Sequence, residues 1–318
     1  MVDENYFHVC LCTDNNYAQH CAVTLCSLFE NNHEHKFVIH ILTNSLDKDY
    51  RIELENLAYR YNAQIFIYNV NSELLNGCQY RIKRPLSEAA YYRVLLASIL
   101  PANINKVLYL DCDIVVLGNI NDLFSLEIDN YPVAAVQEPV EICDDHRNQL
   151  SIPYGESYFN SGVLLINLKY WRDYDCQSAL LEFSKRERHV YCHDQDALNY
   201  VFKTKWYRLP PKWNKSNTAT MELIDFYHIL DKREYIYDAR IIHYIDEPKP
   251  WYKIYGTRYR KKYDKYLKLS GWKINSKIQV KNRIVLYKRV FISRFKGLLY
   301  SIGLLSMIKN FKVLYGKK

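Results

Sequence analysis

Segments typical of β-strands alternate with segments typical of helices along the front of the chain, and this alternation restricts the fold more than any other feature. Runs rich in Val, Ile, Phe and Tyr predict strands, whereas apolar residues three or four positions apart predict helices. Strands that alternate with helices form a mainly parallel sheet covered on both faces. We therefore predict an α/β fold. The expected strands are residues 7–12, 36–43, 63–70 and 106–110, and the expected helices are residues 17–31, 47–61 and 87–100.

The second half of the chain continues this pattern less regularly. Further strands are expected at residues 131–137, 161–168 and 239–245, and a further helix at residues 193–202. The sequence holds no internal repeat and no low-complexity linker. Lys, Arg and Tyr become dense from Lys249 onward, and this change of composition is the basis for one boundary. We expect a first domain of residues 1–253 and a basic, aromatic, mostly helical segment of residues 254–318.

The net charge of +8 comes mostly from the end of the chain, where Lys and Arg are interleaved with apolar residues, as in "KNRIVLYKRVFISRFKGLLY". This pattern is typical of an amphipathic basic helix. Three interpretations are open: the helix binds an anionic membrane surface, it presents a merely solvated face, or it binds nucleic acid. No recognised nucleic-acid motif accompanies the charge, so we expect a membrane surface and no nucleic acid as partner.

The cysteines and the two ends of the chain indicate where in the cell the protein is expected. The 318 residues include nine cysteines, several inside apolar runs rather than at the spacings of a disulfide framework or a zinc site, which favours reduced thiols. The N-terminus is acidic and lacks a basic region followed by an apolar stretch, and the run "GLLYSIGLLSMI" is too short to span a bilayer. We therefore expect a cytoplasmic protein, peripheral on the inner face of the cell membrane.

The stretch "KVLYLDCDIVV" ends an apolar strand with two carboxylates, Asp111 and Asp113. Residues i and i+2 of an extended strand point to the same side, and open α/β sheets bind ligands outside the carboxyl ends of their strands. Two adjacent anions are best explained by a bound cation, because hard divalent ions prefer oxygen ligands. The same Asp-x-Asp spacing also occurs at Asp47/Asp49, Asp173/Asp175 and Asp194/Asp196. Those three pairs fit helix starts or polar turns. Asp111 and Asp113 are therefore the predicted metal site.

Other polar residues follow expected strands at the same edge. Asp14, Asn16 and Tyr17 come after the first strand, in a loop that could contact a base and ribose. His243 and Lys249 follow the last strand, at a similar level. With the two Asp residues they predict a metal-diphosphate site. Taken singly, His243 is equally explained as a hydrogen-bonded core histidine and Lys249 as a surface cation.

Six motifs stand in a consistent order: "TDNNYA", "SEAAYYRVLLA", "VLYLDCDIVV", "YFNSGVLLINLKYWR", "HDQDALN" and "IIHYIDEPKPW". With this order, over roughly residues 6–253, the chain resembles glycosyltransferase family 8, the retaining transferases that include bacterial lipopolysaccharide and lipooligosaccharide α-galactosyl- and α-glucosyltransferases. The resemblance implies a GT-A, Rossmann-like fold. The basic segment from residue 254 lies outside these motifs.

The resemblance also implies roles for single residues. Asp111, Asp113 and His243 match metal ligands that hold Mn²⁺ on the diphosphate of a UDP-hexose. An imidazole ligand also favours Mn²⁺ on chemical grounds, with Mg²⁺ as the alternative. Residues that match the binding site of the nucleotide and its diphosphate are Asp14, Asn16, Tyr17, Asp111 and Lys249. Residues that match the surroundings of the transferred sugar, and are expected to be catalytic, are Arg93, Asn160, Asp194 and Gln195.

Two positions depart from the family's usual pattern. Asp246 stands where glycine is common and brings negative charge close to the expected diphosphate. Glu138 stands where Asp is common, and its extra methylene changes its reach towards the sugar or acceptor. Local sequence alone offers plainer roles for two of the catalytic candidates: Asp194 would cap a helix and Arg93 would pair with a surface acid.

The expected reaction moves galactose or glucose from a UDP-sugar to a hydroxyl of a glycan acceptor, in the synthesis of lipopolysaccharide or another surface polysaccharide. Retention at the anomeric carbon would follow from a front-face route or from a double displacement through Asp194 or Gln195. Three other functions are open: a silent family member that binds membrane and glycan, a glycoside hydrolase that uses two of the carboxylates, and a nucleotidyltransferase.

Overall fold

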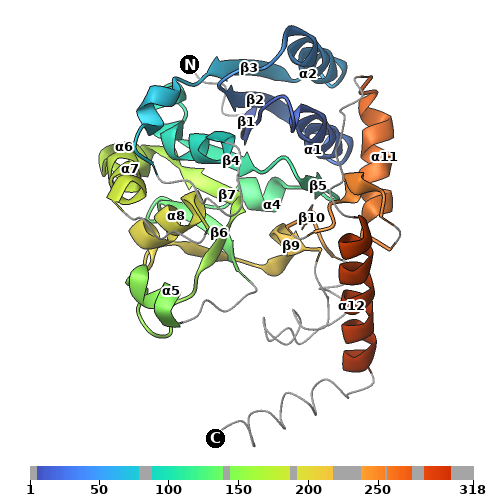
Figure 1. The fold of residues 1–318 in the computed structure, drawn as a ribbon. Coiled ribbons are helices and arrows are strands. Elements are labelled where there is room, and N and C mark those ends of the chain that lie inside the picture. Colours follow the sequence, from blue (N-terminus) through green and yellow to red (C-terminus); the bar gives the residue numbers. More distant parts are fainter. Residues whose placement is uncertain are drawn as a thin grey trace, which may run out of the picture.

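The computed structural model of the protein describes residues 6–78, 88–138, 144–186, 192–217, 238–245, 247–254, 256–273 and 283–301. A seven-stranded sheet of order β3-β2-β1-β4-β7-β6-β8 forms the body of the described chain, and a three-stranded sheet of order β5-β10-β9 lies beside it (Figure 1). The large sheet consists of β1 (Tyr6–Cys12), β2 (Lys36–Thr43), β3 (Gln64–Asn69), β4 (Lys106–Leu110), β6 (Val133–Gln137), β7 (Phe159–Asn167) and β8 (Tyr207–Leu209). The small sheet consists of β5 (Ile114–Val116), β9 (Lys215–Ser216) and β10 (Ile241–His243).

Most neighbours in the large sheet are parallel. β1 pairs in parallel with β2 and β4, β2 with β3, and β6 with β8. β7 runs antiparallel to both of its neighbours, β4 and β6. The mainly parallel α/β sheet predicted from the alternation is therefore confirmed, with β7 as the reversed strand.

Helices cover both faces of this sheet (Figure 1). Alternate residues of β1 face two cores: Val9 and Leu11 belong to the core under α1 and α2, and Cys10 and Cys12 to the core on the opposite face. The α-helices are α1 (Ala18–Glu30), α2 (Lys48–Arg60), α3 (Leu96–Ile99), α4 (Asn121–Phe124), α5 (Asp144–Gln149), α6 (Leu168–Asp173), α7 (Cys176–Arg186), α8 (Asp194–Phe202), α11 (Arg260–Ser270) and α12 (Arg283–Ser301). The 3₁₀ helices are η1 (Ser72–Leu75), η2 (Glu88–Leu95), η3 (Pro211–Trp213) and η4 (Pro250–Tyr252).

α1 is buried along nearly its whole length and holds the loop between β4 and β5. The Thr24 hydroxyl lies 2.9 Å from the carbonyl oxygen of Cys112 and 2.8 Å from that of Ile114, so its single proton is shared by the carbonyl oxygens on the two sides of Asp113. The Ser27 hydroxyl oxygen accepts from Val116 N–H at 2.8 Å. Polar residues one helical turn apart in α1 thus fix the backbone that carries the two carboxylates.

The segment predicted as one helix over residues 87–100 has a different form. Glu88–Leu95 is a 3₁₀ helix, followed by a single α-helical turn, α3, and Ser87, the first residue of the expected range, lies outside the described residues. Tyr91 to Leu95 are buried one after another, whereas an amphipathic α-helix buries one stripe and exposes the rest. The expected helix is thus present from Glu88 to Ile99, but its first part has the 3₁₀ form and is buried on more than one side.

Eight of the nine cysteines lie in the described residues, all as free thiols. Seven of the eight are buried, and Cys192 is exposed. Five of the buried thiols lie in β1, α1 and α7, where they pack as small apolar side chains.

α11 belongs to the main core although it lies beyond residue 253. Tyr263 and Tyr266 are buried against α1, where the Tyr263 hydroxyl contacts His20 Nδ1 at 2.6 Å and the Tyr266 hydroxyl accepts from Asn31 at 2.8 Å. Trp251 of η4 stacks on the His20 ring at 3.7 Å between centroids. α11 therefore packs on the same helix that holds the β4–β5 loop.

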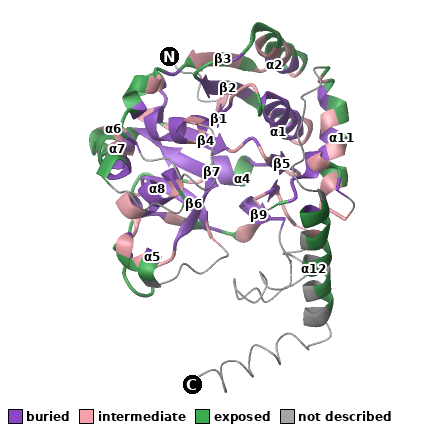
Figure 2. Cartoon of the chain, viewed as in Figure 1, coloured by how far each residue is buried: buried purple, intermediate pink, exposed green. Residues whose placement is uncertain are grey.

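α12 projects from the body with many of its described side chains exposed (Figure 2). Ile284, Phe291 and Leu298 are all exposed and lie seven residues apart, so they share one face of the helix. Among the helices that the structure describes, none combines the length and the apolar character needed to cross a bilayer.

Replacing Tyr263 by Ala should lower the free energy of unfolding by about 3 kcal/mol, because a buried aromatic ring and its contact with His20 are lost. Denaturant titration followed by tryptophan fluorescence measures this change. Tyr59→Ala is the control, since Tyr59 is 83% exposed on α2. Equal stabilities for the two variants would mean that α11 contributes nothing to the core.

Candidate functional site

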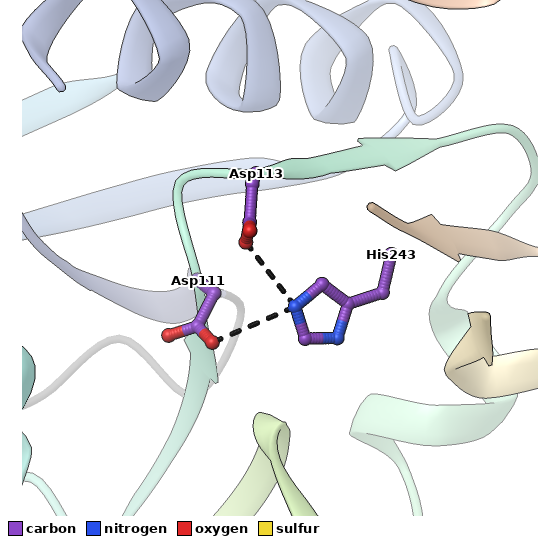
Figure 3. A group of neighbouring side chains, drawn as sticks. All are labelled: Asp111, Asp113 and His243. Carbon is purple, nitrogen blue, oxygen red and sulfur yellow. Dashed lines mark ion pairs between the residues drawn. The ribbon is translucent and has the colours of Figure 1, made fainter. Parts of the chain in front are cut away.

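Asp111, Asp113 and His243 meet at the carboxyl end of β4 (Figure 3). The two carboxylates come from the loop that joins β4 to β5, and His243 is the last residue of β10. His243 Nε2 lies 3.1 Å from Asp113 Oδ1 and 3.7 Å from Asp111 Oδ2. The candidate ligand atoms of the three residues lie within 4.8 Å of one another, and the described ranges contain no second cluster of this kind. The three predicted ligands thus do come together.

The backbone of β7 passes close beneath this cluster. Asp111 N–H donates to the Gly162 carbonyl at 2.8 Å. A Cβ atom at position 162 would stand 2.1 Å from His243 Cε1 and 2.8 Å from Asp111 Oδ2, well inside contact distance. Gly162 is therefore required for the two ligands to approach each other as they do.

Lys249 neutralises Asp113. Its ammonium lies 2.8 Å from Asp113 Oδ2 and also donates to the carbonyl oxygens of Tyr244 and Ile245. Burial by itself would raise the pKa of Asp113, but the charge of the Lys249 ammonium opposes burial, and that pKa lies well below its usual range. Lys249 is almost wholly buried, so it is not the surface cation that the local sequence also allowed.

Arg93 bridges two carboxylates in the interior. Its guanidinium lies 2.9 Å from Asp111 through Nη2 and 2.9 Å from Asp194 through Nε, while the Nε–H itself points to the Ala90 carbonyl. The contact with Asp194 is therefore an ion pair rather than a hydrogen bond. Burial raises the pKa of Asp194 to about 6, against the opposing charge of Arg93.

The plainer roles suggested for these two residues are wrong. Asp194 is the first residue of α8 rather than its cap; the N-cap is His193, which has a left-handed φ of 52°. Arg93 pairs with buried acids and not with a surface acid, because η2 is enclosed by protein.

Asn160 and Gln195, the other catalytic candidates, adjoin this group. Gln195 Oε1 accepts from the backbone N–H of Ser161 at 2.9 Å, and Arg93 donates to the carbonyl of the same residue. The Asn160 amide nitrogen donates to Glu138 Oε2 at 2.8 Å, and Gln195 Nε2 lies 3.5 Å from that same oxygen. The longer side chain of Glu138 thus reaches both amides. Asp246, the other departure, lies outside the described residues.

The loop after β1 lies on the other side of Asp113. Asp14 Oδ1 accepts from the backbone N–H groups of Asn16 and Tyr17, at 2.8 and 3.0 Å, so this carboxylate shapes the loop. The Tyr17 ring meets Trp251 edge to face. Burial, followed by the charge of Asp113, raises the pKa of Tyr17.

Sequence reasoning missed Asn214, which lies between η3 and β9. Its Oδ1 lies 3.0 Å from His243 Nδ1, and its amide nitrogen donates to Asn160 Oδ1 at 2.8 Å. No motif marks this asparagine, because both partners are distant in sequence. The strand pairing of β9 with β10 is what brings it beside His243.

One residue from each of the other Asp-x-Asp pairs, namely Asp47, Asp173 and Asp196, has a structural role. Asp47 precedes α2 as its N-cap, and Asp173 pairs with Lys169 on the surface. Asp196 is fully buried, where it accepts from the Tyr158 hydroxyl at 2.7 Å and the Cys192 N–H at 2.8 Å. The interpretation of these three residues as helix starts or turn residues is consistent with their contacts.

The residues present fit a divalent cation. Two carboxylate oxygens and one imidazole nitrogen converge, and the second nitrogen of the imidazole is already hydrogen-bonded to an amide oxygen. Mixed oxygen and nitrogen ligands suit Mn²⁺ and other transition ions better than Ca²⁺. Without a cation, two adjacent carboxylates would repel each other in a largely buried site.

Gly162→Ala should weaken Mn²⁺ binding by at least about tenfold, because the new methyl group displaces His243 or Asp111. Electron paramagnetic resonance of free Mn²⁺ measures the affinity. The matched control is Gly118→Ala, where a Cβ would meet only the flexible side chain of Arg240. An unchanged Mn²⁺ affinity in Gly162→Ala would mean that cation binding does not require His243 and Asp111 to approach each other over Gly162.

Comparison with known proteins agrees with this geometry. Residues 8–255 match the family described as "Glycosyl transferase family 8". A lipopolysaccharide 1,2-glucosyltransferase of Escherichia coli is 32% identical over 250 residues, which cover 77% of this chain and 73% of the relative. General stress protein A of Bacillus subtilis (strain 168) is 27% identical over 281 residues, 86% of this chain and 96% of that protein.

A solved structure shares the fold. The galactosyltransferase LgtC in complex with donor and acceptor sugar analogues superposes with a TM-score of 0.70 at 23% identity, covering 83% of this chain and 96% of that one. This likeness confirms the GT-A-like fold expected from the motifs. The family match extends over most of the chain and includes every predicted site residue. The chain therefore belongs to glycosyl transferase family 8 and is a glycosyltransferase.

Proposed function

We propose that the protein transfers a hexose from a UDP-sugar to a hydroxyl of a glycan acceptor, with retention at the anomeric carbon and with a divalent cation, Mn²⁺ in the first place. The observation that carries this proposal is the convergence of Asp111, Asp113 and His243 beside a buried lysine, Lys249. A relative named for glucosyl transfer to lipopolysaccharide supports glucose as the first hexose to test, with galactose as the alternative.

The charges of the site suit departure of a nucleoside diphosphate. A cation held by the three ligands would supply positive charge to the diphosphate as its bond to the sugar breaks. Lys249 adds a second positive charge at the same edge of the sheet. Charges aimed at the position where the leaving group becomes anionic lower the barrier without reorganisation.

The sugar would lie against Arg93, Asn160, Asp194 and Gln195. Both side chains that a double displacement would use are engaged: Asp194 is paired with Arg93, and Gln195 Oε1 accepts from Ser161. An engaged carboxylate or amide oxygen is a weak nucleophile. We therefore favour the front-face route, in which a phosphate oxygen of the donor takes the proton of the acceptor hydroxyl.

The nucleoside would lie over the loop after β1. Asp14 shapes that loop, Asn16 is exposed on it, and Tyr17 offers a ring braced by Trp251. An aromatic ring and polar groups at the carboxyl end of a parallel strand suit a base and ribose.

Asp113→Asn should lower Mn²⁺-dependent release of UDP from UDP-glucose or UDP-galactose by at least about a hundredfold, because a ligand of the cation loses its charge. The assay follows UDP from a panel of UDP-sugars with Mn²⁺, with Mg²⁺ and with EDTA. The natural protein should be inactive in EDTA.

The matched control is Asp173→Asn, which changes an exposed Asp-x-Asp residue on α6 and should leave UDP release unchanged. Activity that persists in EDTA, or in Asp113→Asn, would contradict the cation's role. Failure of every UDP-sugar to bind would instead favour a silent family member.

We further propose that residues 254–318 attach the enzyme to the inner face of the cell membrane, mainly through α12, where the acceptor would be a lipid-linked glycan such as a lipopolysaccharide precursor. Phe291 and Phe295 are 70% and 51% exposed, and their rings are stacked on one face. Exposed Lys288 and the net charge of +8 add attraction to anionic lipids. The apolar face would enter the headgroup region without spanning the bilayer.

The double variant Phe291→Ser/Phe295→Ser should bind vesicles containing phosphatidylglycerol at least about tenfold more weakly, because each buried aromatic side chain contributes about 1.5–3 kcal/mol. Co-sedimentation measures binding, with phosphatidylcholine vesicles for comparison. Ile52→Ser, on the exposed side of α2, is the control. Equal binding by the double variant would exclude α12 as the membrane contact.

A further inference from the structure

Four polar side chains form a continuous line from Glu138 to His243. Asn160 Nδ2 donates to Glu138 Oε2 at 2.8 Å, Asn214 Nδ2 donates to Asn160 Oδ1 at 2.8 Å, and Asn214 Oδ1 faces His243 Nδ1 at 3.0 Å. The two asparagines and His243 are buried, and the line runs from the sugar side of the site to the cation side.

Two independent groups near Glu138 determine which atoms of this line donate hydrogen bonds and which accept them. Gly162 N–H, which can only donate, lies 2.9 Å from Asn160 Oδ1. An ionised Glu138 carboxylate, which can only accept, faces Asn160 Nδ2. Both require the same orientation of the Asn160 amide.

The orientation of Asn160 determines that of Asn214. Because Asn160 Oδ1 is an acceptor, the Asn214 atom that faces it must be the donating nitrogen. The other terminal atom of Asn214, the carbonyl oxygen Oδ1, then faces His243 Nδ1. A carbonyl oxygen has no proton to give, so Nδ1 must carry one.

We propose that Asn214 is a positioning residue that keeps the proton of His243 on Nδ1 and so offers Nε2 to the cation. This inference rests on the proposed cation site. Nε2 is the ring nitrogen that faces Asp111 and Asp113 (Figure 3). A second hydrogen bond that fixes the tautomer and plane of a ligating imidazole strengthens cation binding by roughly 10- to 100-fold.

Without Asn214 the carboxylates themselves would favour the wrong nitrogen. Asp113 Oδ1 is 3.1 Å from Nε2 and accepts a proton there, so a neutral His243 with no partner at Nδ1 would keep its proton on Nε2. That proton occupies the lone pair that the cation needs. Asn214 opposes this preference, because an Nδ1–H group has a buried acceptor at 3.0 Å.

The test uses the full-length protein with ¹⁵N-labelled histidine. Nitrogen chemical shifts should show His243 Nδ1 protonated in the cation-free natural protein. Asn214→Leu should move the proton to Nε2. Manganese titration by electron paramagnetic resonance, in the presence of UDP, should show affinity lowered roughly 10- to 100-fold in the same variant.

Two further variants separate the proposed role from general damage. Asn214→Asp can still accept from Nδ1–H and should keep that nitrogen protonated. Asn103→Leu, in an exposed turn, should behave as the natural protein. If Asn214→Leu fails to fold, the protonation of His243 Nδ1 in the natural protein and in Asn214→Asp still tests the role of Asn214.

Each outcome bears on one of the two proposals. An unprotonated Nδ1 in the natural protein, or normal Mn²⁺ affinity in a folded Asn214→Leu, overturns the role of Asn214. Failure of the natural protein to bind Mn²⁺ with UDP overturns the proposed cation site, while the nitrogen shifts still report the tautomer on their own.

Discussion

Three carboxylates, Asp111, Asp113 and Asp194, stand close together in the interior, and their mutual repulsion is the constraint around which the site is built. A buried charge is tolerated only when it is paired. Arg93 lies between Asp111 and Asp194, and Lys249 lies on Asp113. The carboxylates come from the β4–β5 loop and α8, and the two cations come from η2 and the segment after β10. The site therefore exists only when these four parts of the fold are assembled.

Arg93 satisfies several partners at once in the middle of η2. Its guanidinium contacts two carboxylates and the carbonyl of Ser161, and lies 4.4 Å from the centre of the Tyr109 ring. A planar group with five donors can satisfy these partners together, whereas a lysine ammonium cannot. The side chain must enter from a backbone that is itself buried. η2 supplies such a backbone, because Tyr91 to Leu95 are buried one after another.

The sequence predicted those features that depend on short-range pattern. The alternation of strands and helices follows from local periodicity, and Asp111 and Asp113 are recognisable because they end an apolar strand. Asn214 could not be found in this way, since its importance lies in hydrogen bonds to Asn160 and His243 across the fold. The burial of Tyr263 was equally hidden, because a basic segment with many tyrosines resembles a solvated tail until its partner helix is known.

The contacts of Lys249 bear on the order in which ligands would bind. An ammonium has three protons, and all three are used: one on Asp113 and two on the carbonyl oxygens of Tyr244 and Ile245. A diphosphate can receive a hydrogen bond from Lys249 only if one of these contacts is given up. A divalent cation beside Asp113 would balance the charge of this carboxylate, so the contact with Asp113 is the one that can be given up. We therefore expect the cation to bind before the diphosphate or together with it, because the cation is what releases Lys249 from Asp113.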